Sequence, residues 1–454
     1  MSVTPCGNQD GVHSYPKELV SFLLEHWDKP GMREEELEIE GYGHPDKLPD
    51  SSLLEQLIST CYQASLLREE ERPVNFRLIV REPHRFNPEE GPPTGFHRLP
   101  FAVPRPFSEY ELRRLSPAAD FYRSLLGVCC DPAKGLQIWG IVHSGARWTQ
   151  SVHGGRKTAR PLPPSLVIYV TGPGRIAVCR GSLTIASLVA GQITCPSRDI
   201  FNSGWMPESF ADVRNELLLL HLAARDRAKA AWANLEPDFV RTLAQQVVKR
   251  IISTIRNSRH GGTLVYLPVE RAAMLCCEDG YMTVKYQFAD EEPRQRFRSL
   301  LVRVMNAFAE VSADPENPDK VVGWNDYVNS THEEIAHLDE ALFEVAHLIA
   351  GLAAIDGAVI MSKRHELLGF GAVISGDIDK VEMVAQALDS EGEQSVPVLS
   401  EEVGTRHRSA YRLCSELHDA IAIVISQDGN VRVIKWHNEQ VTYWDHVPSG
   451  VLGF

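Results

Sequence analysis

The sequence predicts a mixed α/β protein with two separate domains, and three observations support this prediction. The chain has 454 residues, which corresponds to two or three domains of roughly 150 residues each. Its hydrophobic fraction of 43% and its charged fraction of 23% are typical of a folded chain with a sizeable core. Stretches with helical periodicity and β-rich runs occur in both halves, and the breaker Glu236-Pro237-Asp238 separates the halves. We therefore expect a first domain over residues 51–235 and a second over 236–454.

The first 50 residues are polar and rich in glycine, proline and acidic residues, which predicts a loosely ordered N-terminal segment. Helical periodicity starts near Ser52, and the run NFRLIV at 75–80 predicts a strand. The passage 82–106 is rich in proline, so we predict a loop there.

A sheet is predicted between residues 135 and 193, where the β-rich runs LQIWGIVHSG and SLVIYV occur. The segment TGPGR at 171–175 predicts a turn after SLVIYV. Its GPG triplet lacks the spacing and the Lys-Ser/Thr pair of a phosphate-binding loop, so a hairpin turn is favoured. We expect a mixed or mostly antiparallel sheet, followed by a helix over 213–234.

The second half has a more regular pattern of helices and strands. Apolar residues at steps of three and four predict one helix from Val240 to Ile255 and another from Ile335 to Leu352. We interpret residues 268–330 and the acidic stretch 376–402 as insertions. The expected strands are TLVYLP (263–268), IDGAVIM (355–361), GFGAVI (369–374) and AIAIVIS (420–426).

Charge and cysteine content restrict the partners and the compartment. The 46 Lys and Arg residues against 60 Asp and Glu residues give a net charge of −14, which argues against binding to nucleic acid or to an anionic membrane. The N-terminus has no signal pattern, and no apolar run approaches the roughly 18 residues of a membrane span. Nine cysteines without a CxxC pair fit a reducing compartment, so we expect a cytoplasmic protein.

The segment GTRHRSA carries the first candidate site. Its cluster Arg406-His407-Arg408 holds three cationic or potentially cationic side chains between the flexible Gly404 and a predicted helix. Cations normally prefer the other end of a helix, so this placement indicates that an anion is expected there. Thr405 and Ser409 add hydroxyl donors. From the residues alone, a solvated basic turn is an equally good interpretation.

The segment Asp356-Gly357-Ala358 carries complementary chemistry. An acidic residue at the mouth of an apolar strand, beside a glycine that lets a ligand approach the backbone, is a candidate ligand of Mg²⁺ or Mn²⁺. The alternative is an ordinary turn residue between a helix and a strand.

These two motifs in this order resemble the diadenylate cyclase (DAC) domain family, which includes the DisA-type proteins. The resemblance extends over about residues 237–445, through GGTLVYLP, IDGAVIMS, LLGFGAVI and DAIAIVISQDGNVRVI. It implies a mixed β-sheet flanked by helices, and an enzyme that condenses two ATP molecules into cyclic di-AMP with release of two pyrophosphates. It also implies that two copies face each other, so we expect at least a homodimer.

The resemblance assigns a role to each candidate residue. Asp356 is expected to hold the Mg²⁺ or Mn²⁺ and to activate the 3′-hydroxyl of ATP, and the cluster Arg406-His407-Arg408 to bind phosphates. The remaining expected nucleotide-binding residues are Gly357, Ala358, Ile374, Gly404, Thr405, Ser409 and Ser426. Among these, Ile374 is expected to pack on adenine, and Thr405, Ser409 and Ser426 to hydrogen-bond phosphate or ribose.

Some features depart from the family pattern. Residue 355 is an isoleucine where the membrane-anchored members have a histidine, so the resemblance does not assign a second protein ligand for the metal. We expect no DNA-binding domain after the cyclase region and no membrane helices before it. Two alternatives stay open: an inactive nucleotide-binding sensor, and a cyclase that makes another cyclic dinucleotide.

The first half, residues 50–235, resembles the sensor domains that precede some bacterial DAC domains. The segments PRPFSEYELRRLSPAAD and LQIWGIVHSG carry this resemblance. It implies that the first domain regulates the cyclase in response to a small ligand that the sequence does not identify.

Overall fold

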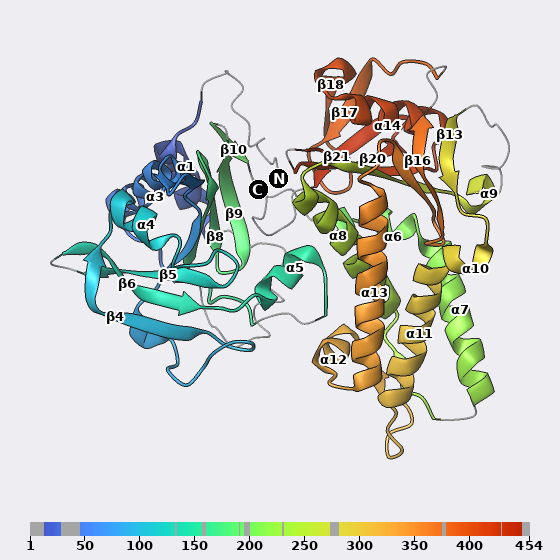
Figure 1. Cartoon of the computed structure of the whole chain (residues 1–454), viewed down its shortest axis with the longest axis horizontal. Coiled ribbons are helices and arrows are strands. Elements are labelled where there is room, and N and C mark those ends of the chain that lie inside the picture. Colours follow the sequence, from blue (N-terminus) through green and yellow to red (C-terminus); the bar gives the residue numbers. More distant parts are fainter. Residues whose placement is uncertain are drawn as a thin grey trace. The chain divides into compact units, whose positions relative to one another are not determined.

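The computed structural model describes residues 13–28, 46–131, 134–156, 160–189, 191–194, 200–228, 231–272, 281–374, 378–427 and 429–446. They form two compact units, each built on its own β-sheet with helices packed against it (Figure 1). The predicted mixed α/β class is therefore confirmed. Cys6, Cys195, Cys276 and Cys277 lie outside the described residues.

The division between the units differs from the predicted boundary at residue 235. The first unit ends with residue 194 among the described residues, and the second unit starts at residue 200 and also takes in residues 153–156. The helix α7 (Ala211–Ala228) belongs to the second unit because its apolar side chains Val213 and Leu217 join the core of that unit.

The first unit contains an eight-stranded sheet in the order β10-β9-β8-β7-β3-β5-β6-β4. Among the described strands, only β3 and β5 pair in parallel, so the prediction of a mixed or mostly antiparallel sheet is confirmed. The strands are β3 (Phe76–Val80), β4 (His97–Pro106), β5 (Ser124–Asp131), β6 (Gly135–His143), β7 (Leu166–Gly172), β8 (Arg175–Arg180), β9 (Leu183–Val189) and β10 (Gln192–Thr194).

Three helices pack their apolar residues against one face of this sheet: α1 (Pro16–His26), α3 (Ser51–Ser65) and α4 (Glu109–Leu115). The helix α1 lies within the N-terminal segment that was predicted to be loosely ordered, and its Leu19 and Leu23 are fully buried. The predicted helix near Ser52 is α3, whose N-terminus is capped by the side chain of Asp50.

The predicted loop over 82–106 is wrong in its last part, where β4 forms the edge strand of the sheet. Proline lacks the N–H that a central strand must donate, so a proline-rich segment reads as loop in the sequence. At an edge, only one side of the strand has to pair, and prolines are tolerated there. The pairing of β4 with β6 also shifts register between Pro100 and Arg105, which absorbs the mismatch.

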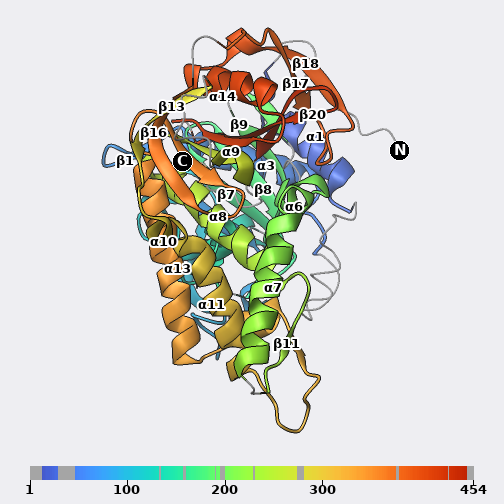
Figure 2. The ribbon, with the colours of Figure 1, turned by 90° about the vertical axis from the view of Figure 1, so that its right-hand side faces the viewer.

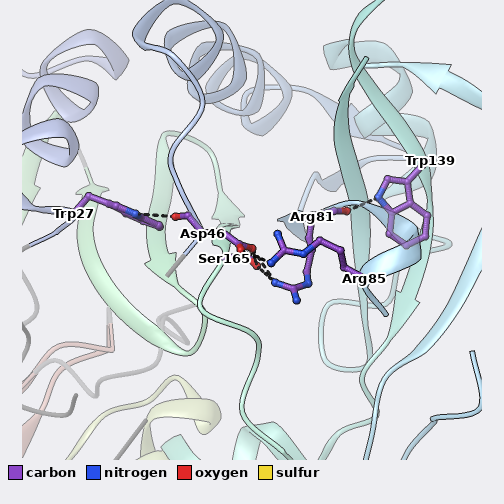
Figure 3. Close-up of polar contacts among 6 residues, drawn as sticks. All are labelled: Trp27, Asp46, Arg81, Arg85, Trp139 and Ser165. Atoms are coloured by element: carbon purple, nitrogen blue, oxygen red, sulfur yellow. Dashed lines mark hydrogen bonds and ion pairs between the residues drawn. The ribbon is translucent and has the colours of Figure 1, made fainter. Parts of the chain in front are cut away.

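An ion-pair cluster around Asp46 fastens the chain to this sheet (Figure 3). Arg81 Nη1 donates to Asp46 Oδ2 at 2.8 Å, and Arg85 Nη2 lies 2.7 Å from Asp46 Oδ1. The hydroxyl of Ser165 also donates to Asp46 Oδ2, and Trp27 Nε1 donates to the Asp46 carbonyl at 3.2 Å. The carboxylate thus contacts donors from two separate segments of the first unit, and the backbone carbonyl of Asp46 contacts a third. We call this group the Asp46 cluster.

The second unit contains a nine-stranded mixed sheet in the order β13-β16-β15-β12-β19-β20-β21-β17-β18. The pairs β12–β15 and β17–β21 are parallel and the other pairs are antiparallel. The strands are β12 (Gly262–Leu267), β13 (Met282–Gln287), β15 (Ala358–Ser362), β16 (Leu367–Ile374), β17 (Met383–Ala387), β18 (Ser395–Leu399), β19 (Ile421–Ile425), β20 (Val431–His437) and β21 (Gln440–His446).

Helices cover both faces of this sheet (Figures 1 and 2). One face packs against α7, α8 (Phe239–Ser258), α11 (Arg296–Val311) and α13 (Glu333–Leu352), and the other against α14 (Thr405–Glu416). Alternation along β12 serves both faces, because Leu264 and Tyr266 enter the first core while Val265 and Leu267 enter the second.

The two segments that the sequence suggests as insertions contribute regular elements to this unit. Residues 281–330 supply the edge strand β13 and the helix α11, whose Leu300, Leu301 and Val304 are fully buried. Residues 383–399 form the hairpin β17–β18, which joins the sheet through the parallel pairing of β17 with β21. Both segments therefore complete the sheet or its helical layer.

Candidate functional site

A large cavity lies where several strands of the second unit begin or end. Its volume is about 770 Å³, counted as the space open to the centre of a water molecule. Pairing of Thr263 with Val424 and of Ala358 with Ala372 brings the starts of β12 and β15 beside the ends of β19 and β16. Segments that are far apart in the sequence therefore meet at one end of the sheet.

Ten of the eleven predicted site residues line this cavity: Asp356, Gly357, Ala358, Ile374, Gly404, Thr405, Arg406, His407, Ser409 and Ser426. The exception is Arg408, which is exposed on α14 and is not part of the cavity wall. The structure thus brings both predicted motifs to one place, with one arginine of the basic cluster turned elsewhere.

Asp356 lies at the turn that leads into β15, and its carboxylate is fully exposed to solvent. Its Oδ1 lies 3.9 Å from Nη2 of Arg406, at the limit of an ion pair. Such a weak contact leaves most of the carboxylate available to a ligand. Asp356 is also the only acidic residue among the described residues that line the cavity.

Gly357 is required by the neighbouring strand. Its φ of +113° is rarely adopted by other residues, and a Cβ at this position would lie 2.6 Å from the carbonyl carbon of Gly371. The glycine therefore lets β15 begin directly against β16, and this close approach sets the position of Asp356.

The N-terminus of α14 faces the cavity. Gly404 is its N-cap and provides no side chain to cap the helix, and no acidic side chain lies in the first turn. The first N–H groups of a helix carry a partial positive charge and lack partners within the helix. The helix α14 has 12 residues, and Arg406 lies in its first turn on the cavity wall. The free N–H groups of this turn and the guanidinium of Arg406 can therefore bind one anion together.

Gly261 positions Arg406, and the sequence did not single it out for this role. A Cβ on Gly261 would lie 2.6 Å from the carbonyl oxygen of Ile425 and 3.2 Å from Nη1 of Arg406. The φ of Gly261 is +67°, so the backbone conformation also favours glycine. This glycine thus leaves the space in which the guanidinium lies.

His407 is neutral near pH 7, which corrects its interpretation as a potential cation. Burial, together with the nearby charges of Arg432 and Arg406, lowers the pKa of His407 to about 4, against a smaller opposing effect of Asp445. Its Nε2 is buried and has no hydrogen-bond partner among the described residues. A buried nitrogen without a partner on the wall of a cavity is available to a ligand.

Arg432 is a cavity residue that the sequence did not identify. Its Nε donates to Oδ1 of Asp445 at 2.8 Å, and its guanidinium lies 4.4 Å from the ring centre of Tyr443. These contacts fix its orientation on β20 beside Val424. One feature of the sequence could have indicated it: Arg432 stands between the apolar residues Val431 and Val433, which are buried, so its side chain points to the other face of the strand.

Ser426 combines a structural contact with a place on the cavity wall. Its hydroxyl oxygen accepts from the Asn430 N–H at 3.1 Å and so holds the turn between β19 and β20. The hydroxyl proton is not used in that bond and can be donated to a ligand.

The donor set suits a divalent metal that is shared with a substrate. The described residues contain no group of three or more His, Cys, Asp or Glu side chains that could enclose a metal ion. Mg²⁺ is commonly held by one or two carboxylates together with substrate phosphates and water, so the exposed carboxylate of Asp356 fits this mode.

None of the helices in the described part of the chain combines the length and the apolarity needed to cross a membrane.

Two family models match the chain. Residues 44–143 match the family described as "Probable sensor domain DACNV", and residues 321–438 match the DAC family, described as "DisA bacterial checkpoint controller nucleotide-binding". Comparison with curated proteins and with solved structures gave no match. The DAC match includes all eleven predicted site residues and Arg432, whereas Gly261 lies before it.

Members of the DAC family are diadenylate cyclases that bind ATP, generally depend on a metal and typically dimerise. The order of the two matched segments also agrees with the resemblance found in each half of the sequence. The chain therefore contains a DAC nucleotide-binding domain that is preceded by a DACNV sensor domain.

Proposed function

We propose that this protein is a diadenylate cyclase that converts two ATP molecules into cyclic di-AMP and two pyrophosphates. The observation that carries this proposal is the cavity in which the exposed carboxylate of Asp356 faces Arg406 and the N-terminus of α14. A nucleotide triphosphate needs both an anion-binding end and a carboxylate that can share a metal with its phosphates.

In the proposed reaction, each ATP 3′-oxygen attacks the α-phosphorus of the other ATP. A 3′–5′ phosphodiester bond forms, the bond between the α- and β-phosphates breaks, and pyrophosphate leaves with the bonding electrons. The proton of the 3′-hydroxyl passes to Asp356 and then to solvent. A divalent metal bound at Asp356 would neutralise phosphate charge and lower the pKa of the hydroxyl.

The cavity residues divide between the two ends of the nucleotide. Arg406, Thr405 and the N–H groups at the start of α14 bind the phosphates, and Arg432 stands close enough to add a second guanidinium. His407 is neutral, so it contributes a hydrogen bond at Nε2 and no charge. Ile374 and Ala358 offer an apolar surface to the base, and Ser426 and Ser409 offer hydroxyls to the ribose or phosphate.

Self-association follows from the chemistry of the product. Each ATP must present its 3′-hydroxyl to the α-phosphate of the other, so two copies of the cavity have to meet face to face. Arg408 is exposed on the same helix as Arg406 but outside its own cavity. We propose that it acts on the nucleotide of the facing copy, and that a small ligand of the DACNV domain regulates the assembly.

The test is incubation of the full chain with ATP and Mn²⁺ or Mg²⁺, followed by mass spectrometry of the products. Wild-type protein should release cyclic di-AMP, and Asp356→Asn should abolish it while retaining the same thermal stability. Asp379→Asn is the matched control, because Asp379 is an exposed acidic residue that does not line the cavity. Full activity in Asp356→Asn would contradict the assigned role of this carboxylate.

The same assay with mixed nucleotides distinguishes the alternatives. A cyclic dinucleotide containing another base would retain the mechanism and change the substrate. Tight ATP binding without pyrophosphate release, for both metals, would identify a nucleotide-binding sensor and contradict the cyclase proposal.

A further inference from the structure

A second cavity lies in the second unit on the opposite face of the central strands from α14. It is lined by residues of α6 (Trp205–Glu208), α7, α8, β12 and β19. The space open to the centre of a water molecule is about 70 Å³. This is several times the roughly 10–15 Å³ that one water molecule requires. Its wall is almost entirely apolar and includes Met206, Phe210, Val240, Ala244, Ile421 and Ile423.

Two polar groups at this cavity have no partner. The hydroxyl of Tyr266 and Nδ1 of His365 are buried, and neither has a hydrogen bond to any described part of the protein. The exposed fractions of the two residues are 1% and 6%, and their ring centres lie 6.4 Å apart. Buried polar groups are nearly always satisfied in folded proteins, so these two groups on the wall of one cavity are available to hydrogen-bond a molecule that enters it.

The backbone holds His365 in this position at some cost. His365 has a φ of +61°, in the left-handed region, and its N–H donates to the Ser362 carbonyl at 2.9 Å. Its ring stacks on Phe210 with centres 5.7 Å apart and lies 4.8 Å from the centre of Phe297. Strained residues of this kind cluster at binding sites, because the surrounding structure has to stabilise them.

The inside of the cavity favours an uncharged ligand. Burial lowers the pKa of His365 to about 4 and raises the pKa of Tyr266, so both groups are neutral near pH 7. The cations at the rim are already engaged, because Arg241 Nη2 donates to Asp238 at 2.8 Å and Arg214 Nη1 to the Pro207 carbonyl at 3.4 Å. Inside the cavity, a charged ligand would lose its hydration among mostly apolar side chains.

We propose that this cavity is a second binding site, for a small, uncharged, mostly apolar molecule that carries one hydroxyl group. The hydroxyl both accepts and donates, so it can satisfy the Tyr266 hydroxyl and the His365 imidazole, while its apolar body fills the space between α7 and α8. At roughly 10–15 Å³ for each water-sized group, the volume of about 70 Å³ admits about five to seven non-hydrogen atoms. The site is distinct from the nucleotide cavity, although both use residues of β12 and β19.

Phenol and toluene are suitable probes, because they share a shape and differ in the hydroxyl. In the full chain with ¹³C-labelled isoleucine methyl groups, phenol should shift the signals of Ile421 and Ile423, which line the cavity. Ile434 lies in the core on the other face of the sheet, so its signal is the internal control. Phenol should bind more tightly than toluene by roughly 3- to 10-fold, the usual range for one hydrogen bond.

Two variants separate binding at this site from general effects. Tyr266→Phe removes the unpartnered hydroxyl and should weaken phenol roughly 3- to 10-fold while leaving toluene unchanged. Tyr327→Phe is the matched control, because Tyr327 is also fully buried with an unpartnered hydroxyl but lies outside the cavity. Ala244→Leu should fill the space and abolish the shifts with both probes.

The proposal is overturned if phenol moves Ile421 and Ile423 no more than Ile434. Equal phenol affinity in wild type and Tyr266→Phe would also overturn it, because the hydroxyl pair would then play no part. None of these measurements depends on cyclase activity, so a failure here is distinguishable from a failure of the proposed enzyme.

Discussion

The two units of this protein each hold a cluster of charged side chains, and the clusters differ in how their charges are paired. In the Asp46 cluster, the carboxylate is 16% exposed and contacts Arg81, Arg85 and Ser165 (Figure 3). At the nucleotide cavity, Asp356 is fully exposed, and its ion pair with Arg406 is 3.9 Å long.

This difference indicates which cluster serves the fold and which serves a ligand. Each carboxylate oxygen of Asp46 contacts a donor within the protein, so these contacts stabilise the first unit. At the cavity, Asp356 and Nε2 of His407 keep unused hydrogen-bonding capacity. Removing a residue from the first cluster should therefore reduce stability, and removing one from the second should reduce activity.

The largest expected effect is on stability. Asp46→Ala leaves the guanidinium of Arg81, which is 11% exposed, without its carboxylate. Breaking an ion pair that is largely but not fully buried costs up to about 3–5 kcal/mol in the free energy of unfolding. Chemical denaturation followed by tryptophan fluorescence measures it, with Asp356→Ala as the control that should lose almost nothing. Equal losses in the two variants would remove the distinction between the clusters.

The next effect is on catalysis. Arg406→Ala should lower kcat/KM for ATP by roughly 100- to 1000-fold, the usual cost of removing one preorganised donor from developing charge. Its neighbour Arg408 does not line the cavity, so Arg408→Ala should have a smaller effect, seen mainly at protein concentrations where assembly limits the rate. A larger loss in Arg408→Ala than in Arg406→Ala would reverse the assignment of the two arginines.

A smaller effect is expected when Arg406 is displaced without being removed. Gly261→Ala places a methyl group 2.6 Å from the Ile425 carbonyl oxygen and 3.2 Å from Nη1 of Arg406. The backbone and the guanidinium both have to move, and we expect kcat/KM to fall by roughly 10-fold. Gly351→Ala is the control, since a Cβ there meets nothing within 4 Å. If the two glycine variants had the same kcat/KM, Gly261 would have no part in positioning Arg406.

The sequence predicted those parts of the fold whose signal is local. Apolar runs located β12, β15 and β19, helical periodicity located α8 and α13, and the motifs located most of the cavity wall. It failed at β4, because proline content hides an edge strand, and the sheet order that makes it an edge is a non-local property. Gly261 and Arg432 were missed for the same reason, since each acts through residues that only the folded sheet brings close.

The state of His407 was also beyond the sequence, because the charge of a histidine depends on its burial. A pKa of about 4 in the folded protein lies below the ordinary value of 6.5. The unfolded chain therefore binds more protons between these values, and the stability from His407 is complete above pH 6.5 and decreases as pH falls toward 4. His153 and His365 have the same shift and should contribute in the same direction.

The smallest predicted effect is the part of this pH dependence that His407 supplies. Between pH 4.5 and 6.5, the free energy of unfolding of His407→Gln should change with pH less steeply than that of wild type, by at most about one proton. Denaturation series across this range measure the slope. If His407 were instead a charged phosphate clamp with a raised pKa, its stabilisation would be lost as pH rises, and the variant would change the slope in the opposite direction. The sign of the difference therefore decides whether the cavity offers phosphate a neutral imidazole or a third cation.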